Sequence, residues 1–106
     1  MNIAELRKII VKRISLDLND DYAIYDCWTQ EINILSENIQ ETIAFIENEC
    51  TDKEFYWISE IFEDIAYKTQ SKEFIKCIKN RLNKLFDKSL IQSIQTDIEF
   101  AESSID

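Results

Sequence analysis

Two pairs of glutamates are the residues whose spacing could support catalysis. Glu60 and Glu63 form one E-x-x-E pair, and Glu99 and Glu102 form a second. Residues three apart lie on one side of a helix, so each pair would bring two carboxylates together. Four carboxylates from two helices could hold Mg²⁺, a cation that prefers oxygen ligands. The chemistry that this spacing could support is therefore catalysis by a bound Mg²⁺ ion.

The same pairs are similar to the E-x-x-E pairs of all-α nucleotide pyrophosphohydrolases. A Mg²⁺-dependent enzyme of that class is therefore one alternative for the function. Its weakness is orientation, because Glu60, Glu63 and Glu102 fall opposite the apolar positions of their predicted helices. An E-x-x-E pair also arises by chance in an acidic helix, so the spacing alone does not identify an enzyme.

The composition excludes most other kinds of catalytic site, because the chain contains no His and no Gly. Without His there is no Ser-His-Asp triad and no H-E-x-x-H zinc site. Without Gly there is no P-loop and no dinucleotide-binding fingerprint. We therefore expect a protein that is not an enzyme and that holds no cofactor and no metal.

The three cysteines, Cys27, Cys50 and Cys77, stand far apart and form no C-x-x-C pair. An odd number at wide spacing is a poor disulfide framework and a poor zinc site. Each lies beside apolar residues in a predicted helix, so we expect buried free thiols. No apolar run is long enough to span a bilayer, and the charged N-terminal stretch does not have the pattern of a signal peptide. Together these features predict a cytoplasmic protein.

Length and composition predict one helical domain over residues 1–106. A chain of this length suits a single hydrophobic core. It has neither Gly nor Pro with which to build tight hairpin turns between strands. Apolar residues recur instead at spacings of three and four, which indicates amphipathic helices. We expect an all-α fold, a single antiparallel bundle of five or six helices with no sheet.

Polar capping residues mark where these helices are expected to begin and end. One apolar stripe is unusually long, and it predicts either one helix or two helices nearly in phase with a break at Ser36 or Asn38. The first expected helix runs from about Asn2 to Leu16, and the long stripe follows from Trp28 to Cys50. The capping box Thr51–Glu54 opens the next helix, which runs to about Thr69, and Ser71 caps the one after it. A turn at 87–89 then leads to a last helix, whose apolar face extends from Leu90 to Ile105.

Charge is segregated along the chain, which carries a net charge of −9. Residues 17–52 hold ten acidic residues and no basic one, whereas residues 68–88 hold seven basic residues and two acidic ones. Like charges one turn apart repel, so such a segment needs cations from elsewhere. The simplest interpretation is that the basic helix over Lys68–Lys88 packs beside it and compensates. The alternative is an acidic surface left for a basic partner.

One predicted surface combines acids with tyrosines. On the helix after Thr51, the apolar stripe leaves five residues on the opposite face: Tyr56, Glu60, Glu63, Asp64 and Tyr67. Tyrosine is common among binding hot spots, because it offers a large rigid contact with a polar tip. We predict that these residues bind a partner, with Asp26, Glu37 and Glu41 as a secondary acidic surface. The plainer interpretation is that the tyrosines lie over neighbouring helices and the acids are ordinary surface.

The stretch Trp57-Ile-Ser-Glu-Ile-Phe-Glu-Asp-Ile-Ala-Tyr-Lys-Thr-Gln-Ser-Lys-Glu-Phe-Ile, with Asp97-Ile-Glu-Phe-Ala-Glu102, resembles small acidic immunity proteins of bacterial contact-dependent growth inhibition and related polymorphic toxin systems. The resemblance covers about half of the chain. It implies a cytoplasmic protein that neutralises one cognate toxin domain, often a nuclease, by covering its active site or substrate groove. It implies no direct contact with nucleic acid or membrane, and it does not specify an oligomeric state.

Composition agrees with this expectation, because a nuclease needs a basic cleft to hold phosphates and an acidic inhibitor would complement it. A second alternative is an acidic DNA mimic or adaptor that occupies a nucleic-acid-binding protein. That alternative predicts binding to several such proteins in place of one cognate partner. A basic helix over Ser71–Lys88 could itself suggest nucleic-acid binding, but the sequence pI of about 4.5 opposes it.

Overall fold

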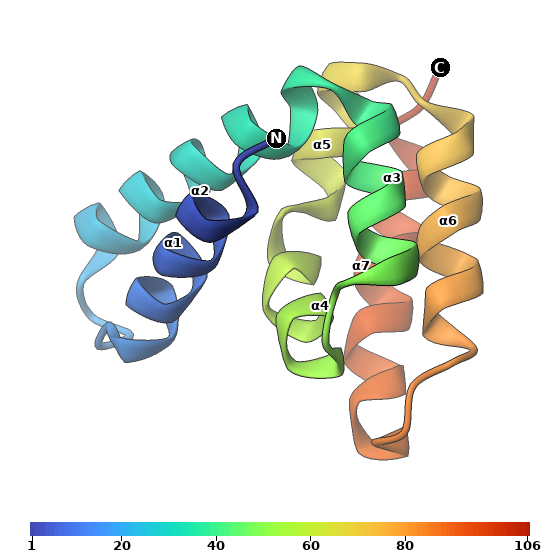
Figure 1. Cartoon of the computed structure of the whole chain (residues 1–106). Helices are drawn as coiled ribbons and strands as arrows, with labels where there is room; N and C mark the ends of the chain where they lie inside the picture. Colours follow the sequence, from blue (N-terminus) through green and yellow to red (C-terminus); the bar gives the residue numbers. More distant parts are fainter.

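The computed structural model describes residues 1–106 and contains helices joined by short turns, with no strand (Figure 1). The all-α prediction is confirmed, and the number of helices agrees when α4 and α5 are counted as one bent helix. The elements are α1 (Ile3–Ser15), α2 (Asp21–Glu37), α3 (Ile39–Asn48), α4 (Asp52–Ile58), the 3₁₀ turn η1 (Ser59–Ile61), α5 (Phe62–Thr69), α6 (Lys72–Leu82), the 3₁₀ turn η2 (Lys88–Leu90) and α7 (Ile91–Ser103).

Side-chain caps mark the start of several helices, and those at Asn2, Thr51 and Ser71 were predicted. The side-chain oxygens of Asn2, Asn38, Thr51 and Ser71 each accept a hydrogen bond from the backbone amide three residues later. At Thr51 the box is complete, because the Glu54 carboxylate accepts in return from the Thr51 backbone amide at 3.0 Å. These bonds satisfy amides that have no partner within the helix. The sequence signals for where helices begin are therefore reliable in this chain.

The long apolar stripe forms two helices, one of the two predicted alternatives, and the break lies at Asn38, one of the two positions considered. The backbone of Asn38 is extended, with φ −138° and ψ 96°, so the α-helical hydrogen bonds stop there. The Thr42 hydroxyl donates to the Leu35 carbonyl at 2.7 Å and joins the two helices across the break. The orphan carbonyl at the end of α2 thereby gains a partner.

The prediction of one continuous helix from Thr51 to Thr69 is wrong. A 3₁₀ turn over Ser59–Ile61 separates α4 from α5. The Ser59 hydroxyl donates to the Tyr56 carbonyl at 2.5 Å, a local bond that competes with the α-helical pattern. The turn changes the phase of the helix, so the positions before and after it do not share one face.

Helix α5 ends at a position that usually holds glycine. Gln70 has φ 51° and ψ 33°, the left-handed conformation, in a chain with no glycine to supply it. Its side chain donates to the Ser104 carbonyl at 3.1 Å and accepts from the Asp106 backbone amide at 2.8 Å. These bonds between α5 and the end of α7 offset the backbone strain.

Helices α5, α6 and α7 alternate in direction, as expected for an antiparallel bundle, while two close pairs join helices that are not consecutive (Figure 1). α5 packs along α7 in the same direction, and α3 packs along α6 in the same direction. The Cys77 thiol contacts the Ile43 carbonyl between α3 and α6. α1 and α2 form an antiparallel hairpin that lies to one side of the other helices, against α4 and α5.

The core is built around buried aromatic rings. Phe62 contacts Phe55 and Phe74, with ring centroids 5.3 and 5.8 Å apart in tilted and edge-on geometry. Such pairs stabilise a core by about 0.5–1.5 kcal/mol beyond the area that they bury. The largest fully buried side chains otherwise are Phe45, Leu6, Ile10, Leu35, Ile46, Ile58, Ile61, Ile65 and Ile78. The predicted apolar stripes therefore do face the interior.

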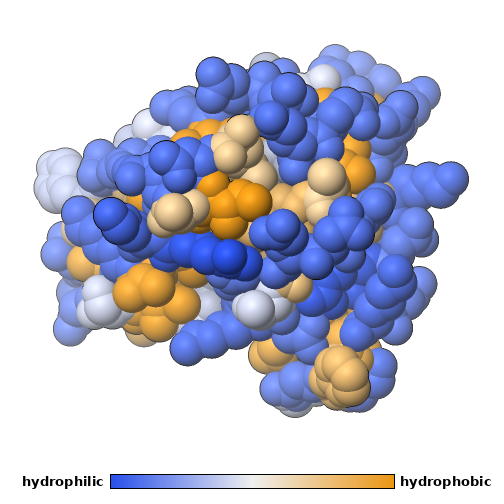
Figure 2. Space-filling view, viewed as in Figure 1, coloured by the Kyte–Doolittle hydropathy of each residue, from blue (hydrophilic) through white to orange (hydrophobic).

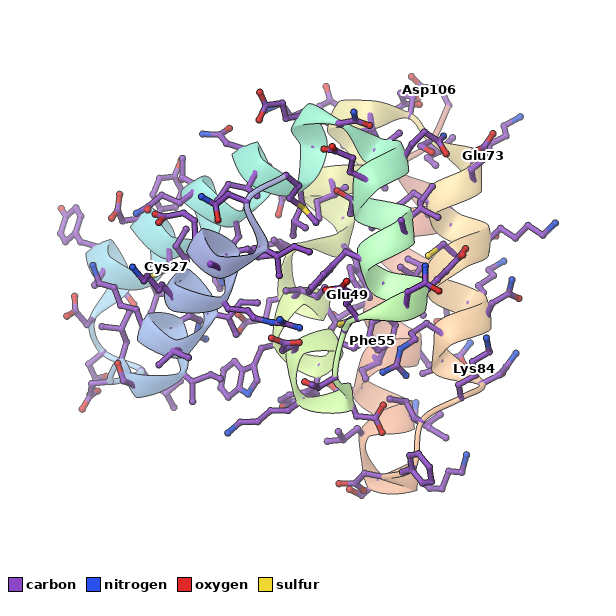
Figure 3. All side chains as sticks on the ribbon, in the orientation of Figure 1. Cys27, Glu49, Phe55, Glu73, Lys84 and Asp106 are labelled. Atoms are coloured by element: carbon purple, nitrogen blue, oxygen red, sulfur yellow. The ribbon has the colours of Figure 1, made fainter.

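All three cysteines are buried free thiols, as predicted. Figure 3 shows Cys27 between α1 and α2. Burial raises the pKa of Cys50 to about 12 and that of Cys77 to about 11, and it also raises the pKa of Cys27. The thiolate is the reactive form, so these side chains are inert at neutral pH.

Every helix is too short or too polar to traverse a bilayer. Figure 2 shows a mostly hydrophilic face with apolar surface between α1 and α3. A groove of about 240 Å³ lies at that position, lined in part by Met1, Ile3, Ala44 and Phe45.

Candidate partner-binding surface

Glu60 does not lie on the solvent-facing line predicted for it. Its carboxylate accepts two hydrogen bonds from the Arg13 guanidinium, at 3.1 and 2.6 Å, and one from Trp28 Nε1 at 2.9 Å. The Arg13 side chain is only 6% exposed. The 3₁₀ turn directs Glu60 toward α1 and α2, so this carboxylate serves the packing of the hairpin.

Tyr56 is also less available than predicted. It is half-buried and packs against the hydrophobic core, with its ring edge-on to Trp57 at 5.5 Å between centroids. This placement matches the plainer interpretation, in which the tyrosine covers neighbouring elements. The solvent-facing line of Tyr56, Glu60, Glu63 and Tyr67 therefore does not form.

The remaining three residues of that set do reach solvent. Glu63, Asp64 and Tyr67 are exposed on α5, and Tyr67 is 70% exposed. Glu63 and Asp64 lie in the first turn of α5, where the helix dipole favours negative charge. Two carboxylates and one tyrosine therefore form a small acidic surface on α5.

The secondary acidic surface divides in a similar way. Asp26 and Glu37 are exposed on α2, and Asp26 accepts a hydrogen bond from Gln30 at 2.9 Å. Glu41 on α3 instead pairs with the amino group of Met1 at 2.7 Å. Asp26 and Glu37 thus stay available to a partner, while Glu41 already has a cation beside it.

A richer surface lies on the N-terminal half of α2, and sequence reasoning missed its aromatic part. Tyr22 is 92% exposed and Tyr25 is 69% exposed, and both lie beside exposed carboxylates of Asp21 and Asp26. Positions i, i+1, i+4 and i+5 lie on one side of a helix, so the four residues form one surface. We call it the α2 surface. The sequence does carry a sign of this surface, because Tyr22 and Tyr25 do not belong to the apolar stripe of this helix.

The carboxylates of α2 have no cationic partners. None of the four acidic residues of this helix forms an ion pair, although the chain contains ion pairs elsewhere: Arg7–Glu54, Arg13–Glu60, Lys79–Glu102 and Arg81–Asp52. Compensation by the basic helix α6 reaches only one end of the acidic segment, where Arg81 binds Asp52 at 2.8 Å. Lys84, which follows the end of α6, lies far from the hairpin in Figure 3. The interpretation that the basic helix compensates the acidic segment is therefore wrong for α2, whose acidic residues form no ion pair with α6.

The ion pairs that do form have a structural role. A backbone hydrogen bond from Phe86 and the Arg81 guanidinium hold the pKa of Asp52 below its ordinary value. For Glu54, burial raises the pKa, but hydrogen bonds from Arg7 and Thr51 outweigh it and the net shift is downward. These contacts tie α1 to α4 and α4 to α6, so their charges are not free for a ligand.

The two E-x-x-E pairs do not meet at one site. Glu60 is engaged by Arg13, and Glu102 pairs with Lys79. No group of three or more His, Cys, Asp or Glu side chains lies close enough together to hold a metal ion. The arrangement expected for a Mg²⁺-dependent pyrophosphohydrolase is thus not formed by Glu60, Glu63, Glu99 and Glu102.

Comparisons with protein-family models, with curated proteins and with solved structures find no match for this chain. The resemblance to acidic immunity proteins stays a prediction.

Proposed function

We propose that this protein is an immunity-type inhibitor that binds one basic toxin domain and covers its active site or substrate groove. A nuclease is the class of toxin that this proposal favours. The observation that carries the proposal is the α2 surface, where exposed carboxylates without ion partners stand beside two exposed tyrosines. The resemblance in sequence and the net charge of −9 support the same function.

The α2 surface has the chemistry that a phosphate-binding cleft would recognise. Such a cleft holds Lys and Arg side chains spaced for phosphates, and carboxylates at Asp21 and Asp26 can take the place of those phosphates. Complementary charge speeds encounter and sets specificity. Tyr22 and Tyr25 supply apolar contact area with few rotatable bonds, which is typical of residues that dominate binding energy.

The fold holds this surface on a well-packed helix. On the inner side of α2, Ile24, Cys27 and Leu35 are buried, which fixes the orientation of the outer side. A surface carried by a packed helix loses little conformational freedom on binding. The Glu63, Asp64 and Tyr67 surface on α5 is the second place where the toxin could bind.

Co-purification with the basic domain encoded by the neighbouring gene tests the proposal. We expect a complex that survives gel filtration at modest salt and toxin activity that is lost in the complex. A Tyr22→Ala, Tyr25→Ala variant should weaken binding by at least about tenfold, as for hot-spot tyrosines. Phe86→Ala is the matched control, because Phe86 is 94% exposed and lies outside both acidic surfaces.

The same experiment separates the alternatives. If Tyr67→Ala weakens binding and the α2 variant does not, the toxin binds at α5. If the protein instead binds several unrelated nucleic-acid-binding proteins with similar affinity, it is an acidic DNA mimic or adaptor. The absence of any toxin-like neighbour and of any complex would overturn the proposed function. Because such toxins act on nucleic acid inside the cell, we place the protein in the cytoplasm.

A further inference from the structure

One carboxyl group of α2 faces inward. Glu31 is 1% exposed, and neither of its carboxylate oxygens has a hydrogen-bond partner. A buried carboxylate without a partner is costly, whereas the protonated form tolerates an apolar site far better. Glu31 takes no part in the proposed binding surface, which lies on the opposite side of the helix.

The groups around Glu31 come from each element packed on this part of α2. α1 contributes Arg13, which is 5% exposed, and η1 contributes Glu60, which occupies the Arg13 guanidinium with two hydrogen bonds. Asp97 on α7 is close enough to Glu60 for their charges to interact. On α2 itself, the Cys27 thiol lies one turn before Glu31. Glu31 and Glu60 therefore share the Arg13 guanidinium, and Asp97 adds a further carboxyl group beside Glu60.

This cluster lies where the α1–α2 hairpin meets the rest of the molecule. Arg13 and Glu31 belong to the hairpin, and Glu60 and Asp97 belong to the elements against which it packs. The rings of Trp28 and Trp57 lie over the Arg13 guanidinium, with centroids at 5.9 and 5.1 Å. Any change in charge at Glu31 therefore acts on the contact that docks the hairpin.

The charge state of Glu31 changes near neutral pH. Burial, with the charge of Glu60, raises the pKa of Glu31 to about 7, and the opposing effect of Arg13 is smaller. Burial and the charge of Glu60 also raise the pKa of Asp97, and the nearby Ser59 hydroxyl acts in the opposite direction. In a detached hairpin Glu31 would meet water and return to its ordinary pKa.

We propose that Glu31 is a proton-operated latch between the α1–α2 hairpin and the rest of the molecule, closed when its carboxyl is protonated and loosened when it ionises. The latch is independent of any toxin. Only one consequence rests on the proposed function, namely that the position of the α2 surface, and hence the affinity for the toxin, varies with pH around neutrality.

Hydrogen exchange of the isolated protein tests the latch. Protection factors of the hairpin amides, corrected for the intrinsic effect of pH, are compared at about pH 6 and about pH 8.5. Linkage between an ordinary pKa in the open form and the raised value in the closed form predicts about tenfold loss of protection across that range. Glu31→Gln should abolish the loss, while Glu37→Gln, an exposed carboxylate on the same helix, should leave it unchanged.

Tryptophan fluorescence gives a second readout that does not depend on exchange rates. Trp28 donates to Glu60 and lies over Arg13, so a Trp57→Phe variant isolates a reporter inside the cluster. We expect a fluorescence transition near pH 7 that disappears when Glu31→Gln is added. Protection that is independent of pH, or a transition that persists in the Gln variant, overturns the latch. Neither measurement involves the toxin, so either proposal can fail alone.

Discussion

At the scale of single residues, burial decides what each carboxylate does. Glu60 and Glu63 are three positions apart and look equivalent in the sequence, yet Glu60 is engaged by Arg13 and Glu63 is exposed. The partner of Glu60 lies 47 residues away in the chain, on α1. Spacing along one helix carries no information on such a contact, so the sequence could not predict it.

The stability of the protein should fall as pH rises from about 4.5 to about 7 because of Glu31. Folding raises the pKa of this group, so the native state holds its proton more tightly than the unfolded state and loses that advantage as the group ionises. Glu31→Gln should therefore raise the free energy of unfolding by about 2–3 kcal/mol at pH 8. Urea unfolding of both proteins at pH 5 and pH 8 measures this free energy. If it changes equally with pH in the two proteins, Glu31 is not the group responsible.

Charge reversal at the two glutamates should have unequal effects. Glu60→Lys leaves the buried guanidinium of Arg13 unpaired beside a second cation, and we expect a loss of about 3 kcal/mol in the free energy of unfolding. Glu63→Lys changes an exposed side chain and should alter that free energy by less than about 0.5 kcal/mol. Thermal and chemical unfolding compare the two variants, and similar losses in both would show that the Arg13–Glu60 pair is unimportant.

At the scale of helices, the sequence predicts beginnings better than it predicts continuity. A cap is a local arrangement of four residues, and the caps at Asn2, Thr51 and Ser71 formed as expected. The break at Ser59 was missed because the apolar stripe continues through it. The Ser59 hydroxyl bonds locally to the Tyr56 carbonyl at the break, and the Arg13–Glu60 contact beside it joins residues far apart in the sequence.

The complete capping box at the start of α4 gives a quantitative test. Thr51→Ala removes the hydroxyl that accepts from the Glu54 amide, and we expect a loss of about 1 kcal/mol in stability. Thr51→Ser keeps the acceptor and serves as the control. Chemical denaturation of the three proteins gives the comparison; a stability in the Ala variant equal to wild type would mean that water replaces the cap at no cost.

At the scale of the whole molecule, the distribution of charge matters more than the net charge. The sequence identifies residues 17–52 as an acidic segment and supports an all-α fold. It could not show that α6 packs on α3 and forms no ion pair with α2, because that depends on which helices become neighbours. The main predicted binding residues were placed on one helix over 51–69, whereas two exposed tyrosines beside exposed carboxylates lie on α2.

Binding should depend steeply on salt if the α2 surface contacts a basic cleft. Exposed charges are screened within about 8–10 Å at physiological ionic strength, so added salt weakens their attraction. Asp21→Asn with Asp26→Asn should reduce both the affinity and its dependence on salt. Glu73→Gln is the control, since Glu73 is exposed on α6, on the far side of the molecule in Figure 3. An identical salt dependence in wild type and the double variant would place the contact elsewhere.

The most direct test of the central claim is calorimetric titration of the purified protein into the basic toxin domain encoded beside it. We expect a one-to-one complex at low ionic strength, loss of toxin activity at equimolar protein, and an affinity lowered by the Tyr22→Ala, Tyr25→Ala variant. The absence of detectable binding at low ionic strength, with both proteins folded, would contradict the proposed inhibition.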